Sequence, residues 1–218
     1  MRLHLKLTNS KTIIPFDHFS NIIGAVHKWI GKNEIHDTLS LYSLSRLKGS
    51  KVVTDGFLFE NDPTFFISSF DNSLIKKIID GVNQSPDVAY GMTVKELVIQ
   101  PDPDFSQQER FFLASPVLIK RTLGKNVKHF TINDLESDAL LIETMQNKFN
   151  HAGLNGTELS IKFDRNYPTP KIRVVTYKGI MNKVSSCPIL MEGSPAAKAF
   201  AWNVGIGNST GIGFGSLI

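Results

Sequence analysis

The order of the hydrophobic periodicities along the first hundred residues constrains the fold more than any other feature of the sequence. Residues 2–7 (RLHLKL) alternate apolar and basic side chains, which predicts a half-buried strand. Apolar residues then recur at helical spacing between Phe19 and Ile30, where we expect Asp17 to cap the helix and Gly31 to end it. The chain therefore begins with a strand followed by an amphipathic helix.

Further strands and a second helix complete the first hundred residues. Strand-like runs occupy residues 39–47, 57–59, 65–69 and 94–99. A turn at 61–63 is expected to separate the two middle pieces, and Asp71 is expected to begin the second helix. The resulting order, β-α-β-β-α-β, is that of the ferredoxin-like unit.

A proline-containing linker at residues 101–105 leads into a second, less regular unit. Asn133 and Glu136 resemble a capping box for a helix that stops near Gly153, and Ser194 is expected to open a short helix through Trp202. Strands are predicted at 111–119, 159–163 and 171–174, the last two paired with each other. The sequence thus predicts an α+β protein of two tandem ferredoxin-like (RRM-like) domains, residues 1–100 and 106–218, with a C-terminal glycine-rich loop.

Composition narrows the class of protein. The net charge of +4 over 218 residues suits a polyanionic partner. Cys187 is the only cysteine, which excludes a disulfide framework and a cysteine-based zinc site and fits a cytoplasmic location. Four scattered histidines match no metal motif: His4, His18, His129 and His151. We therefore expect no metal, no cofactor, no signal peptide and no membrane association.

The last stretch, NVGIGNSTGIGFGSLI, carries five glycines. It matches neither a dinucleotide fingerprint nor a P-loop, because no lysine lies in it and only three residues follow Gly215. Two interpretations stay open from the residues alone: a turn that closes a terminal strand, or a loop whose backbone approaches another molecule closely.

Two stretches, IHDTLSLYSLSRLKG at 35–49 and VGIGNSTGIGFG at 204–215, resemble the CRISPR-associated repeat-processing endoribonucleases, the "Cas six" family of the RAMP superfamily. The glycine pattern G-hydrophobic-G, five-residue spacer, G-hydrophobic-G is the most specific part of this resemblance. It implies tandem ferredoxin-like domains and a terminal loop that lies against RNA. It also implies metal-independent cleavage of CRISPR precursor RNA within its repeats, by attack of a ribose 2′-OH, to leave 2′,3′-cyclic phosphate and 5′-OH ends and generate guide crRNAs.

The resemblance identifies three candidates for catalysis. His36 lies where the family motif places its catalytic histidine, and an ordinary surface histidine is the alternative. His27 falls where family members often carry a tyrosine, and a half-packed helix-border histidine is equally compatible. Tyr42 could supply a hydroxyl, although an aromatic residue in a strand is more often part of the core.

The basic residues suggest how RNA would be held. The lysine that some family members carry shortly after the histidine is missing here, so Arg46, Lys48 and Lys51 are the candidates for phosphate charge. A basic hairpin is predicted from Lys162, Arg165, Lys171 and Arg173, and a second basic cluster from Lys120, Arg121, Lys125 and Lys128. The loop is expected to contact RNA through Gly205, Gly207, Asn208, Ser209, Gly213 and Gly215. Solvated strand surfaces are the alternative for the charged clusters.

Two other functions share these features. A catalytically silent relative could hold CRISPR repeat RNA or sit in an effector complex, and only cleavage that depends on His36 separates it from the enzyme. A ferredoxin-like domain for a small phosphorylated metabolite is the third reading, which the absence of a helix after the glycine loop disfavours. By resemblance, the partners are precursor and mature CRISPR RNA, a second copy in a homodimer, and a CRISPR effector complex.

Overall fold

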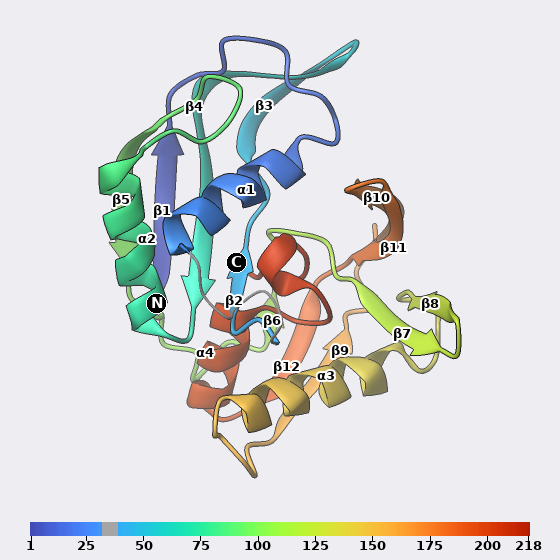
Figure 1. The fold of residues 1–218 in the computed structure, drawn as a ribbon. Helices are drawn as coiled ribbons and strands as arrows, with labels where there is room; N and C mark the ends of the chain where they lie inside the picture. The colour runs from blue at the N-terminus through green and yellow to red at the C-terminus, as the bar shows by residue number, and fades with distance from the viewer. Residues whose placement is uncertain (32–38) are drawn as a thin grey trace.

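The computed structural model describes residues 1–31 and 39–218, and strand β1 (Arg2–Leu7) lies at the centre of its first half (Figure 1). Leu3, Leu5 and Leu7 are fully buried, as the alternation predicted. β1 pairs antiparallel with β4 (Gly56–Ser69) on one side and with β5 (Val94–Gln100) on the other. β2 (Tyr42–Leu44) extends the sheet beyond β4, which gives the order β2-β4-β1-β5.

A strand that the sequence did not predict, β3 (Lys48–Val53), pairs with the first part of β4. The predicted turn at 61–63 is wrong for the same reason. Pairing with β3 carries β4 through these residues, and a local register shift together with a positive φ of 46° at Asp62 absorbs the irregularity. The outer part of this hairpin is largely exposed and projects beyond the helices in Figure 1.

Helices α1 (Phe19–Ile30) and α2 (Asn72–Gln84) cover one face of this sheet (Figure 1). Asp71 caps α2 by accepting a hydrogen bond from the Ser73 amide at 2.7 Å, as predicted. Asp17 does not cap α1: the N-cap residue is His18, whose ring Nδ1 lies 2.9 Å from the Pro15 carbonyl. Gly31 ends α1 with a φ of 81°, a left-handed angle that favours glycine.

The second half contains a three-stranded antiparallel sheet in the order β6-β12-β9, two hairpins and two helices. The sheet strands are β6 (Arg110–Phe111), β9 (Leu159–Phe163) and β12 (Ile189–Gly193). The hairpins are β7 (Ile119–Leu123) with β8 (Asn126–Phe130), and β10 (Lys171–Tyr177) with β11 (Ile180–Ser186). The two α-helices are α3 (Ser137–His151) and α4 (Pro195–Val204), and a short 3-10 turn, η2 (Thr210–Ile212), follows α4.

Several sequence predictions for this half are wrong. β9 pairs with β12 and β10 with β11, so the two basic strands do not pair with each other. The strand predicted at 111–119 is interrupted, because its middle forms only isolated bridges to Leu217 and Ser185. The capping box fails as well: α3 begins at Ser137, after Glu136, whose side chain makes no capping hydrogen bond. Ser194 does cap α4, through the Ala197 amide.

The two halves are joined by a buried arginine near the N-terminus. The Arg2 guanidinium lies between the Phe66 and Trp202 rings, 3.7 and 3.5 Å from their centroids, and donates to the Leu217 carbonyl at 2.7 Å. Strand β1 therefore contacts helix α4 and the C-terminal segment directly. Among the residues described, none of the helices is both long and apolar enough to cross a membrane.

Candidate functional site

The terminal glycines are required by close packing inside the protein. At Gly213, with φ 84°, an added Cβ would lie 2.0 Å from Cε1 of Phe19 on α1. At Gly215, with φ 61°, it would lie 1.8 Å from the Ile206 carbonyl oxygen. Both positions combine left-handed backbone with no room for a side chain. The terminal segment, red in Figure 1, lies at the centre of the molecule between the two halves.

This packing bears on the expectation that the glycines present their own backbone to RNA, which stays a prediction. All four glycines of the predicted contact (Gly205, Gly207, Gly213 and Gly215) are buried. The amides of Gly205, Gly213 and Gly215 donate to carbonyl groups within the chain. Partial exposure in the loop is confined to Asn208, Ser209 and Ile212. A ligand approaching the loop meets these three residues first.

The Asn208 side chain is largely used inside the protein. Its Oδ1 accepts hydrogen bonds from the Lys120 amide at 2.9 Å and from Arg121 Nη1 at 3.3 Å. The backbone N–H of Asn208 donates to the Leu118 carbonyl at 2.7 Å. Arg121, which the sequence predicted to belong to a basic cluster, also pairs with Glu143 on α3, so it links the loop to that helix. Ser209, the next polar residue of the spacer, is partly exposed and has a left-handed φ of 60°.

Lys148 on α3 holds the loop from behind, a role that the sequence reasoning missed. The residue is 1% exposed, and its ammonium group donates to the carbonyls of Val204 and Gly205 and to the Thr210 hydroxyl, at 3.0, 2.9 and 3.2 Å. A signal was present in the sequence: Lys148 continues the helical stripe of Leu141 and Met145, which predicts that it faces the core.

Tyr42 packs against the same loop from the other half. Its side chain is 4% exposed, and a Cβ on Gly211 would lie 2.9 Å from the phenol oxygen. Burial raises the pKa of Tyr42 to about 12, only partly opposed by a hydrogen bond with Ser40. The phenol therefore stays protonated at neutral pH, and its hydroxyl can donate and accept hydrogen bonds.

A cavity of about 160 Å³ opens beside Tyr42. It is lined by residues 39–42, by the start of α2 and by His151 at the end of α3. The first of these residues, Leu39, directly follows the segment that carries His36. His36 itself lies outside the described residues, and its role stays a prediction. His27 is half-buried on α1.

Arg46 lies where α1, the terminal loop and β10 meet. Its guanidinium carbon is 4.1 Å from the Phe19 ring centroid and 5.4 Å from that of Phe214. Burial lowers the pKa of Arg46 to about 10, while Tyr177 acts to raise it, so the side chain remains charged at neutral pH. Its buried Nη2 has no hydrogen-bond partner among the described residues. A buried guanidinium nitrogen without a hydrogen-bond partner in the described part of the chain calls for an acceptor.

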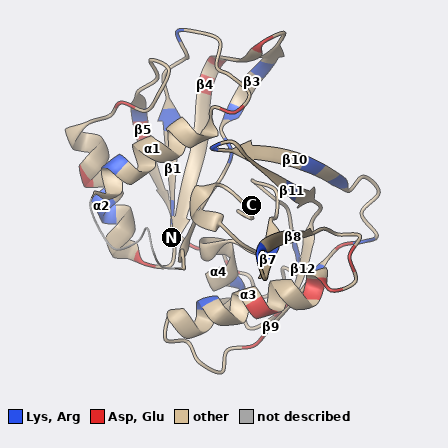
Figure 2. Cartoon of the chain, turned by 45° about the vertical axis from the view of Figure 1, so that its right-hand side comes forward, with Lys and Arg blue, Asp and Glu red and all other residues tan. Residues whose placement is uncertain are grey.

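The basic residues expected to form one hairpin are divided between two sites. Lys162 on β9 pairs with Glu192 at 3.4 Å, and Arg165 pairs with Asp138, so neither belongs to the β10–β11 hairpin. Lys171 and Arg173 lie on β10, and both are exposed. Lys48 and Lys51 are exposed on β3. Figure 2 shows blue segments on β3 and on β10, so these exposed cations belong to two separate hairpins.

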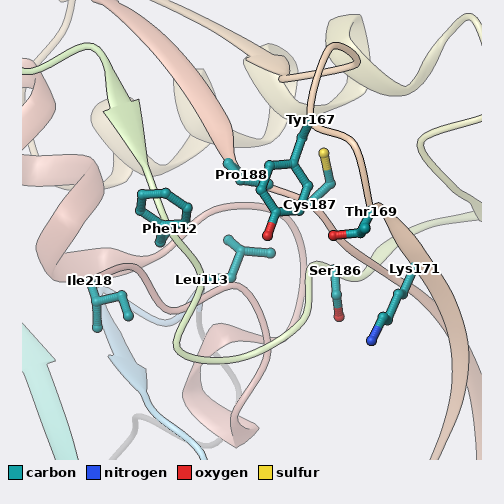
Figure 3. Close-up of a pocket in the computed structure, with 9 residues that line it drawn as sticks. All are labelled: Phe112, Leu113, Tyr167, Thr169, Lys171, Ser186, Cys187, Pro188 and Ile218. Atoms are coloured by element: carbon teal, nitrogen blue, oxygen red, sulfur yellow. The ribbon is translucent and has the colours of Figure 1, made fainter.

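A second cavity, of about 370 Å³, lies beside the start of β10 (Figure 3). The rings of Phe112 and Tyr167 and the hydroxyl groups of Thr169 and Ser186 line it, with Lys171 at one side. Aromatic rings, hydroxyl groups and one cation together can accommodate a planar, hydrogen-bonding anion.

Comparisons with known proteins agree with this geometry. The chain is similar over its whole length to a structure titled "CRISPR associated protein Cas6", with 17% identity, a TM-score of 0.84 and 98% of that chain covered. A Cas6-related protein from Pyrococcus furiosus and "An RAMP protein binding different RNA substrates" each match all of this chain, with 19% identity and a TM-score of 0.85, over 97% and 99% of their own lengths. No curated protein sequence matches the chain.

The sequence itself matches a family description as well. Residues 100–217, more than half of the 218, match the family "CRISPR associated protein Cas6, C-terminal". The matched region includes Lys148 and the whole glycine-rich loop. The chain belongs to the Cas6 family of CRISPR-associated RAMP proteins.

Proposed function

We propose that this protein is a metal-independent endoribonuclease that cuts CRISPR precursor RNA within its repeats and so generates guide crRNAs. In the reaction, a ribose 2′-oxygen loses its proton and bonds to the adjacent phosphorus. The bond from phosphorus to the 5′-oxygen breaks, and that oxygen takes up a proton. The products are a 2′,3′-cyclic phosphate and a 5′-OH. Membership of the Cas6 family implies precursor RNA processing, and the finer chemistry is our proposal.

One observation carries the proposal: the terminal glycine-rich loop is seated against Tyr42. The phenol contacts Gly211, and the backbone carbonyl of Tyr42 accepts a hydrogen bond from Thr210 at 2.9 Å. Leu39 and Tyr42 line one cavity, and the segment containing His36 ends immediately before Leu39. The two motifs that resemble the family in sequence are therefore in contact through their described parts.

The catalytic roles are assigned from the chemistry of each group. We assign His36 to proton transfer, because an imidazole with a pKa near ~6.5 can both accept and donate at neutral pH. Tyr42, protonated and buried, is assigned to hydrogen bonding and not to taking up the 2′-OH proton. Arg46 supplies positive charge to the phosphate through Nη2, which has no hydrogen-bond partner in the described part of the chain. His27 is assigned as a second proton-transfer group, which its half-buried place on α1 permits.

We assign the grip on RNA to the exposed cations of the β3 and β10 hairpins, namely Lys48, Lys51, Lys171 and Arg173. The cavity of Figure 3 supports this assignment, since unstacked RNA bases pack on aromatic rings and bond to hydroxyl groups. The two halves, residues 1–100 and 106–218, are proposed to be tandem ferredoxin-like domains. A cytoplasmic location, a homodimer and a CRISPR effector complex belong to the same proposal.

The test is incubation with CRISPR repeat RNA from the genome that encodes this chain, in EDTA, comparing wild type with His36→Ala. We expect cleavage in EDTA and a loss of about 10²- to 10⁴-fold in the variant, the usual contribution of a positioned acid or base. RNA that is bound but never cut by the wild type would favour the catalytically silent binding module. RNA that is not bound at all would contradict both functions.

A further inference from the structure

Lys148 is a buried ammonium group with no carboxylate partner in the described part of the chain. It lies near the end of α3, 1% exposed, in a stripe of buried residues that faces the core. Its three hydrogen-bond acceptors are the Val204 carbonyl, the Gly205 carbonyl and the Thr210 hydroxyl. An ammonium group has three N–H donors, so its hydrogen-bonding capacity is satisfied in full.

The two carbonyl groups are those with which α4 ends. Helix α4 runs from Pro195 to Val204, and Gly205 is its C-cap. The last carbonyl groups of a helix lack intrahelical partners and carry partial negative charge, so a cation is stabilising there. Lys148 supplies that cation from another helix. It therefore fixes the point at which the glycine-rich loop leaves α4.

The third acceptor extends this contact to the other half of the protein. Thr210, the first residue of η2 and 1% exposed, accepts from Lys148 and donates its own hydroxyl proton to the Tyr42 carbonyl at 2.9 Å. A hydrogen-bonded chain thus runs from α3 through the loop to β2. It holds the loop on both sides of its partly exposed residues, Asn208 and Ser209.

Burial destabilises the charged form of Lys148, because desolvation lowers its pKa to about 7. A methionine of similar length would fill the same space without that cost. Lys198 is a second buried lysine in this half: it is 3% exposed on α4 and donates to the Gln108 carbonyl, which lies outside the loop. Of these two buried lysines, Lys148 is the one whose ammonium group donates hydrogen bonds to the loop.

We propose that Lys148 is a positioning residue, which through Thr210 fixes the terminal loop and the Tyr42 strand in the arrangement that accepts RNA for cleavage. The inference rests on the proposed endoribonuclease function. It adds a residue with no direct contact to substrate, on a helix that carries none of the candidate catalytic groups. Its effect reaches the site only through the hydrogen-bonded chain.

The test compares four variants: Lys148→Met, Thr210→Val, Thr210→Ser and Lys198→Met. Cleavage of repeat RNA is measured as kcat and KM at a temperature at which circular dichroism shows each variant folded. We expect Lys148→Met and Thr210→Val each to lower kcat/KM at least about tenfold, a factor that corresponds to about 1.4 kcal/mol. Thr210→Ser, which keeps the hydroxyl, should restore the wild-type value, and Lys198→Met should match wild type.

Hydrogen exchange of residues 205–213 provides a second readout that needs no RNA. We expect faster exchange in Lys148→Met and Thr210→Val than in wild type and Lys198→Met. Wild-type kcat/KM and exchange in both loop variants would overturn the proposal, as would an equal loss in Lys198→Met. If Lys148→Met does not fold, the contrast between Thr210→Val and Thr210→Ser decides. A wild type that does not cut RNA, with the expected exchange pattern, would instead refute the endoribonuclease function and leave the loop contact intact.

Discussion

Replacing Gly215 by alanine tests whether the terminal glycines serve internal packing. Gly124, in the β7–β8 hairpin, is a matched control, because the two residues have nearly the same φ, 61° and 62°. At Gly124 an added Cβ meets no atom within 4 Å, whereas at Gly215 it would lie 1.8 Å from the Ile206 carbonyl oxygen. Any difference between the two alanine variants therefore reports the close contact and not the backbone angle.

The expected loss of stability has two sources, the left-handed backbone angle and the close contact of the added Cβ. A left-handed residue with a side chain costs about 1–2 kcal/mol, and both variants incur that cost. Overpacking of a filled core costs about 1–3 kcal/mol more, and only Gly215→Ala incurs it. At about 2–4 °C per kcal/mol for a chain of this size, Gly215→Ala should melt roughly 2–12 °C below Gly124→Ala.

The assay is urea unfolding followed by circular dichroism, with thermal melts alongside it. Equal losses of unfolding free energy in the two variants would refute the packing explanation. If Gly215→Ala keeps its stability but no longer binds RNA, the result would instead support direct contact between the glycine backbone and RNA.

Three further predictions concern other sites. Gly24→Ala, at an exposed position of α1 with no atom within 4 Å of the added Cβ, should stabilise the protein by about 0.5–1 kcal/mol in urea unfolding, and a loss of stability would contradict the helix-propensity argument. Arg46→Met should reduce the log-log salt slope of RNA binding by about 0.7, the value for one phosphate contact on a single strand, and an unchanged slope would remove Arg46 from the interface. Burial lowers the pKa of His18 below its usual 6.5, so its contribution to stability is complete above about pH 6.5 and is lost as the pH falls toward the folded-state value. Wild type should accordingly lose more unfolding free energy than His18→Phe between pH 7.5 and 5, and parallel losses would show that His18 does not titrate with unfolding.

The sequence predicted best the elements whose periodicity is strong and local. The strict alternation of residues 2–7 gave β1 its correct bounds, and the carboxylate of Asp71 predicted the start of α2. Pairing partners were predicted poorly in the second half. β9 and β10 both alternate, but the choice of β12 for one and β11 for the other depends on contacts distant in sequence.

The sequence predicted several residues of the candidate site but not the contacts between them. Glycine spacing indicated the terminal loop, but only the packed structure shows that Phe19 and Ile206 leave no room for side chains there. Arg46 was predicted as a candidate for phosphate charge, but the sequence did not predict that its guanidinium lies against two aromatic rings. Lys148 was overlooked because a lysine in a helix is ordinarily solvated, and its burial depends on the end of α4.

The chemistry of the cut ends tests the central claim most directly. Repeat RNA is cleaved in EDTA, once with natural ribose and once with a single 2′-deoxyribose at the cut position, and the termini of the products are identified by mass spectrometry. We predict a 2′,3′-cyclic phosphate and a 5′-OH from the natural RNA and no cut at the deoxyribose. Cleavage of the deoxy substrate at that position, or a 5′-phosphate on the product, would contradict attack by the 2′-OH.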